Sequence, residues 1–152
     1  MGQRWSAAAA VAIMAAAGCT AGCGGGSDAP EPLSNTQFRD QAAAICTRFA
    51  ADVAKVKYPA EPAGFRRWAV EVGGLQREAL DELADITPPD RVRSTFDDFQ
   101  SALATFRDST IAAADKVAAR ADDMRAALAA NTAQQRRTQP LARELGLTGC
   151  VL

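Results

Sequence analysis

Four cysteines are the residues in this chain best suited to covalent chemistry, and no histidine accompanies them. Cys19 and Cys23 lie near the start, whereas Cys46 and Cys150 lie in the body of the chain. Histidine is the commonest general base and metal ligand, so its absence argues against most hydrolases and metalloenzymes. We therefore expect the cysteines to attach and crosslink the chain, and we expect no enzymatic activity.

Three pairs of adjacent acids are the other residues that could do chemistry, namely Asp81-Glu82, Asp97-Asp98 and Asp122-Asp123. Two carboxylates can catalyse glycoside hydrolysis, but neighbouring residues on a helix point about 100° apart. These pairs also fall on the polar sides of their segments, which is typical of solvated faces. A di-iron site in a helical bundle would need Glu-x-x-His. The sequence thus predicts no catalytic residue, no metal site and no cofactor.

Residues 1–22 have the layout of an export signal. Arg4 supplies a positive charge, Trp5–Ala17 carry no charge, and small residues follow up to a cysteine. The apolar stretch is long enough for a signal-peptide core and too short to span a bilayer. The alternatives are an alanine-rich helix packed on the domain and N-myristoylation at Gly2, whose short pattern ends at Ser6. Export also explains the Gly-Cys that follows, so we expect the segment to be removed.

The end of this segment resembles the lipoprotein signal of bacteria, in which small residues and glycine precede a cysteine that becomes lipidated. Ala16-Ala17-Gly18 leads into Cys19, and Thr20-Ala21-Gly22 leads into Cys23. Lipidation at Cys19 would leave Cys23 as an unpaired thiol outside the cytoplasm, where thiols are oxidised. Lipidation at Cys23 leaves no unpaired cysteine in the mature chain, which favours Cys23, with Cys19 as the alternative. Neither cysteine has the leucine that this signal usually carries three positions earlier.

Residues 23–33 have the composition of a tether, and residues 34–152 that of one domain. Glycine and serine make residues 24–27 a flexible linker, and two prolines then extend it. The domain is rich in alanine and poor in aromatic residues, which favours helix over sheet. The formal net charge of the whole chain is −1, so nucleic acid is not an expected partner.

Apolar residues recur at spacings of three and four in four segments, which predicts an up-down-up-down four-helix bundle. The first helix is expected over 35–57, where Ser34 and Gln37 form a capping box. The second begins at Ala63 and ends before Thr87-Pro88-Pro89. Its Gly73-Gly74 pair implies either a close neighbouring helix or a bend.

The third segment has the clearest pattern, and its end is open to two interpretations. Phe96, Phe99 and Phe106 lie on an apolar stripe that continues to Val117. A turn at residues 120–122, with Asp122 capping a fourth helix, competes with one long helix that ends at Asn131. In the fourth helix, Pro140 should kink or break the chain, and Gly146 should end it.

Cys46 and Cys150 form an even pair in an exported chain, so we predict a disulfide between them. Antiparallel helices of similar length bring the chain end back towards Cys46. A third helix of about 40 residues would stand roughly 60 Å tall and overshoot its partners. The disulfide therefore favours the turn near residue 120.

The signal, the cysteine motif, the tether and the closing residues 145–150 together resemble the small secreted alanine-rich helical lipoproteins of high-GC Gram-positive bacteria. Most members of that group have no known function. The resemblance implies a lipid-anchored protein on the outer face of the cell membrane, and it implies no catalytic residue.

Two functions are compatible with these features. The first is a non-catalytic binding or scaffolding module for a protein partner. The second is a carrier of a lipid or other apolar ligand between the second and third helices, near Trp68, Phe96 and Phe99. Small alanines opposite large aromatic side chains can leave a dry cavity there, although such a stripe more commonly forms ordinary core.

Overall fold

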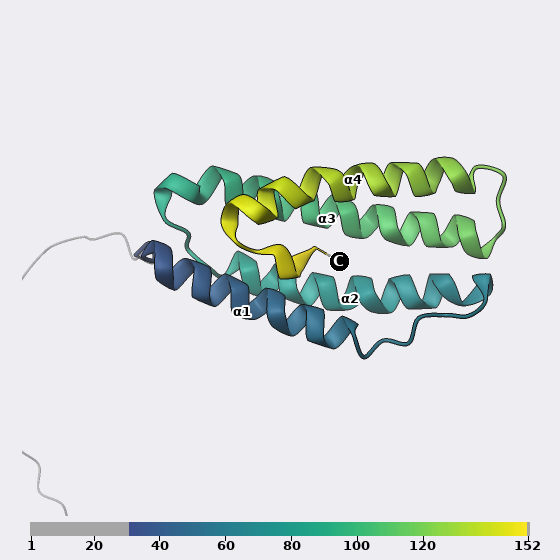
Figure 1. The fold of residues 1–152 in the computed structure, drawn as a ribbon, viewed down its shortest axis with the longest axis horizontal. Helices are drawn as coiled ribbons and strands as arrows, with labels where there is room; N and C mark the ends of the chain where they lie inside the picture. The colour runs from purple at the N-terminus through teal and green to yellow at the C-terminus, as the bar shows by residue number, and fades with distance from the viewer. Residues whose placement is uncertain (1–30, 152) are drawn as a thin grey trace, which may run out of the picture.

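The computed structural model describes residues 31–151, and four helices account for most of them (Figure 1). They are α1 (Asn35–Val53), α2 (Phe65–Ala84), α3 (Asp90–Ala118) and α4 (Met124–Leu145). Successive helices run in opposite directions (Figure 1), so the predicted up-down-up-down bundle is confirmed. The predicted signal, residues 1–22, and most of the tether lie outside the described residues.

The helices form two layers, with α1 and α2 in one and α3 and α4 in the other (Figure 1). α2 packs on α3, and α3 packs on α4, whereas α1 packs on α2 and on η2 (Thr148–Cys150), a 3-10 turn at the end of the chain. After α4 the chain reverses and places η2 against α1 (Figure 1). The C-terminal turn thus contributes to the packing around both α1 and α4.

Large buried side chains fill the half of the bundle that contains α1. The rings of Phe38 and Phe96 pack edge to face with centroids 5.0 Å apart, and Phe99 is fully buried in the same core. Leu83, Leu103, Leu145 and Leu147 complete this core. The aromatic stripe on α3 therefore contributes, at Phe96 and Phe99, to ordinary core packing.

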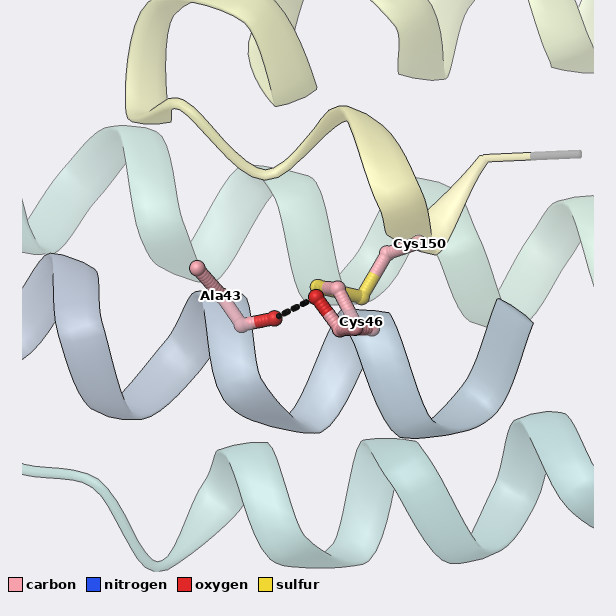
Figure 2. The surroundings of a disulfide bond; sticks show 4 residues. Ala43, Cys46 and Cys150 are labelled. Atoms are coloured by element: carbon pink, nitrogen blue, oxygen red, sulfur yellow. Dashed lines mark hydrogen bonds between the residues drawn. A yellow bond between two sulfur atoms is a disulfide. The ribbon is translucent and has the colours of Figure 1, made fainter. Parts of the chain in front are cut away.

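The predicted disulfide is present in this core (Figure 2). Cys46 of α1 and Cys150 of η2 have Cα atoms 4.5 Å apart and a sequence separation of 104 residues. Both residues are buried. The backbone at Gly149 approaches so closely that a Cβ there would lie 3.4 Å from the Cys46 carbonyl oxygen.

The capping box predicted at the start of α1 is present, but the helix is shorter than expected. The Gln37 N–H donates to Ser34 Oγ at 3.3 Å, and the Ser34 N–H donates to Gln37 Oε1 at 3.1 Å. α1 ends at Val53 instead of residue 57, because the next turns are closed by i→i+3 bonds such as Lys55 N–H to Asp52 O at 3.0 Å. The chain then runs through residues 54–61 and a short 3-10 turn, η1 (Pro62–Gly64).

Gly73 is the point where α2 and α3 approach closely. Of the two alternatives predicted for the glycine pair, a close neighbouring helix or a bend, the first is confirmed. A Cβ at Gly73 would lie 3.0 Å from Ile111 Cδ1 of α3, whereas one at Gly74 would meet nothing within 4 Å. α2 runs without a break through both residues. Only Gly73 is therefore required by packing.

The turn between α3 and α4 lies near residue 120, as the disulfide argument favoured. Arg120 has a φ of 52°, and its N–H donates to Val117 O while the Ala121 N–H donates to Lys116 O. This is the Schellman arrangement, which usually has glycine where Arg120 stands. The expectation that Asp122 caps α4 is wrong, because the residue preceding the helix is Asp123 and its carboxylate makes no capping bond.

Pro140 was expected to kink or break α4, and the break is wrong. The helix continues from Met124 to Leu145 through the proline. Thr138, Ala142 and Leu145 are buried on both sides of it. Tertiary packing therefore outweighs the lost backbone hydrogen bond, and Gly146 ends the helix as predicted, with a φ of 78°.

Candidate ligand-binding site

The two ends of the bundle differ because α1 is much shorter than α3. α1 has 19 residues and α3 has 29, so they are about 28 and 43 Å long. Figure 1 shows α1 ending well before the turn that joins α3 to α4, with a loop continuing to that end. There, the loop of residues 54–61 takes the place of a first helix beside α2 (Figure 1).

A cavity of about 320 Å³ lies at this end, between α2, α3 and α4. This volume is at the lower end of the range typical of small-molecule pockets, about 300–1,000 Å³. Its lining consists of Tyr58, Phe65, Trp68, Val72, Gln76, Phe106, Thr110, Ala113, Ala114, Val117, Leu128 and Asn131. Nine of these are apolar or aromatic and none is charged, so the cavity is suited to an uncharged, mainly apolar molecule.

Aromatic rings form one wall of the cavity. Tyr58 meets Phe65 and Trp68 edge to face, with ring centroids 5.3 Å apart in both pairs. Tyr58 is 63% exposed, which places it at the rim. Phe65 and Trp68 lie on the first turn of α2, and Val72 and Gln76 continue the same helix face at the four-residue spacing of an α-helix.

Three polar side chains interrupt the apolar lining. Asn131 Oδ1 lies 2.8 Å from Ser109 Oγ and 3.0 Å from Thr110 Oγ1, and both hydroxyls also lie within 2.9 Å of the Phe106 carbonyl oxygen. Thr110 and Asn131 thereby hold each other in place across α3 and α4. Gln76, the third, is only 5% exposed and bonds at 3.5 Å to the carbonyl oxygen of Leu103.

The structure separates the three residues predicted to line a ligand groove. Trp68 lines the cavity. Phe96 and Phe99 do not, because they lie in the core towards the other end of the bundle, 2% and 0% exposed. The part of the expectation that rested on these two phenylalanines is corrected: the aromatic residue that α3 contributes to the cavity is Phe106.

Sequence reasoning missed Gln76 and Asn131 as cavity residues. Gln76 had a detectable signal, because it stands four residues after Val72 at a core position of the α2 stripe. Asn131 had none, since it belongs to a polar stretch of α4.

The paired acids lie at the surface, as expected from their positions. All six residues are exposed. Glu82 pairs with Arg48, and Asp123 accepts from Lys116 Nζ at 2.8 Å. The hydrogen bond from the Lys116 ammonium holds the pKa of the Asp123 carboxyl below its usual value.

Within residues 31–151, no three metal-ligating side chains gather into a group, and no helix is long and apolar enough to cross a membrane. Cys46 and Cys150 are joined, whereas Cys19 and Cys23 lie outside the described residues. Searches of protein-family models, curated proteins and solved structures found no match to this chain.

Proposed function

We propose that this chain is a non-catalytic binding module that takes a small apolar molecule into the cavity between α2, α3 and α4. The observation that carries the proposal is a cavity of about 320 Å³ with an apolar and aromatic lining that contains no charged side chain. Such a lining favours ligand binding over scaffolding of a protein partner. The acid pairs lie at the surface and outside the cavity lining, which supports a role without catalysis.

The module is exported and held at the outer face of the cell membrane by a lipid on Cys23, or on Cys19. The signal-like segment, the cysteine motif and the tether support this anchor. The Leu33 N–H donates to the Thr87 carbonyl oxygen at 3.1 Å, so the chain enters the domain beside the connection of α2 and α3. That end lies opposite the cavity (Figure 1), so an anchor there leaves the cavity clear of the attachment point.

Calorimetric titration of the full chain with 2-naphthol tests the binding function. An apolar cavity of about 150 Å³ holds one benzene ring, which has six carbons. The cavity between α2, α3 and α4 has about twice that volume, about 320 Å³, so it has room for about twelve carbons. The ten-carbon ring system of naphthol fits within that limit. We expect one site with a Kd below about 1 mM. Ala113→Phe, which places a ring in the cavity, should abolish binding.

Ala129→Phe is the matched control, because it adds the same ring on the exposed face of α4. It should leave binding unchanged. The proposal fails if the parent chain binds no naphthol, or if both variants bind as the parent does. Melting curves of the variants establish that each is folded.

A further inference from the structure

Gln76 places a side-chain amide in the cavity lining, and residues 31–151 engage that amide only weakly. It is 5% exposed and lies on α2 among apolar cavity residues. Its one bond, from Nε2 to the Leu103 carbonyl oxygen, is 3.5 Å long, beyond the usual range of N–H···O bonds. Among residues 31–151, no hydrogen bond reaches Gln76 Oε1.

An amide in this position calls for a partner. A side-chain amide offers two donors and a carbonyl oxygen, and buried polar groups are nearly always paired with protein, water or ligand. A leucine or methionine would fill the same volume without any unpaired group. The carbonyl oxygen of Gln76 is therefore available to a donor group that enters the cavity.

The other amide oxygen of the cavity is already engaged. Asn131 Oδ1 accepts from the hydroxyls of Ser109 and Thr110. Gln76 thus remains as the acceptor for a ligand, and it lies eight residues, or about 12 Å, along α2 from Trp68. The cavity therefore has an aromatic outer end and a polar inner end.

We propose that the ligand is a compact uncharged amphiphile of ten to twelve carbons, whose single hydroxyl or N–H group donates to Gln76 Oε1. This inference rests on the proposed binding function. The apolar body lies against Trp68 and Phe106, and the polar group points inward. A charged group is excluded, because no lining side chain would compensate its burial.

A two-by-two comparison of ligands and proteins tests the inference. 2-Naphthol and 2-methylnaphthalene have similar shapes, but only the first donates a hydrogen bond. Gln76→Met keeps an unbranched side chain of similar length and removes the amide. We expect the ratio of the two Kd values to shift by about tenfold or more against naphthol in this variant.

Gln41→Met, at an exposed position of α1, is the matched control and should leave the ratio unchanged. A ratio that is the same in the parent chain and in Gln76→Met overturns the inference and leaves the binding function intact. Failure of both ligands to bind the parent chain overturns the binding function itself.

A third ligand makes the test independent of any variant. 2-Methoxynaphthalene keeps the oxygen but has no proton to donate. The parent chain should bind 2-naphthol more tightly than this ether, although the ether is the more apolar molecule. The reverse order would contradict a hydrogen bond to Gln76 Oε1.

Discussion

Removal of the disulfide should cost this protein a large share of its stability. In the double variant Cys46→Ala/Cys150→Ala, the unfolded chain regains the freedom that the crosslink withholds across a separation of 104 residues. The chain-entropy model gives about 4.7 kcal/mol for a loop of this length. Both cysteines are buried, so truncating them also loosens the packing of η2 on α1. Domains are typically stable by about 5–15 kcal/mol, so we expect the variant to be close to unfolding.

Urea unfolding followed by circular dichroism measures this loss, and its slope tests the mechanism. Without the crosslink the unfolded chain is less compact, so the m-value should rise as the midpoint falls. Leu147→Ala is the control, because it removes a side chain that is 1% exposed from the same C-terminal segment and leaves the loop closed. It should lower the midpoint with an unchanged m-value. A loss below about 1 kcal/mol in the double cysteine variant, with the same m-value, would refute the reasoning.

Four further variants test the packing, the backbone at one turn and one surface charge. Gly73→Leu should destabilise the protein by about 1–3 kcal/mol in urea unfolding, because even a Cβ there would lie 3.0 Å from a side chain of α3. Gly74→Ala should stabilise it by about 1 kcal/mol, because a Cβ at that position meets nothing within 4 Å. Equal effects of the two variants would be inconsistent with the close approach of α3 to Gly73. Arg120→Gly should stabilise by about 1 kcal/mol, since φ is 52° at this residue, and no gain in melting temperature would count against strain there. The folded-state pKa of Asp123 is lowered by the hydrogen bond from Lys116, so the stabilising contact is present above the unfolded pKa and is lost as the pH falls through the folded value. Asp123→Asn should therefore lower the melting temperature at pH 7 but not at pH 2, and an equal decrease at both values would show that the charge is not responsible.

The bundle could be predicted because its signals are local. Apolar spacing, the capping box at Ser34 and the glycine at 146 each act within one or two turns of helix, and all are found in the structure. The Cys46–Cys150 disulfide added one long-range restraint, and it favoured the turn near residue 120. The pairing was predicted because the chain is expected to be exported, and disulfides persist outside the cytoplasm.

The errors arose where packing between distant segments outweighs local preference. Pro140 is accommodated because α4 has buried residues on both sides of it. Phe96 and Phe106 stand on the same stripe of α3, yet one lies in the core and the other lines the cavity. The difference depends on how far α1 extends along α3, and spacing on α3 alone carries no information about that.

Native mass spectrometry of the protein extracted from its own membrane tests the central claim, a lipid-anchored module with an occupied apolar cavity. The mass should correspond to a chain that begins at Cys23, or at Cys19, with a covalent lipid and the Cys46–Cys150 disulfide. A non-covalent adduct of an uncharged small molecule should accompany it and be absent from Ala113→Phe. A full-length, unlipidated chain that carries no adduct would contradict the account.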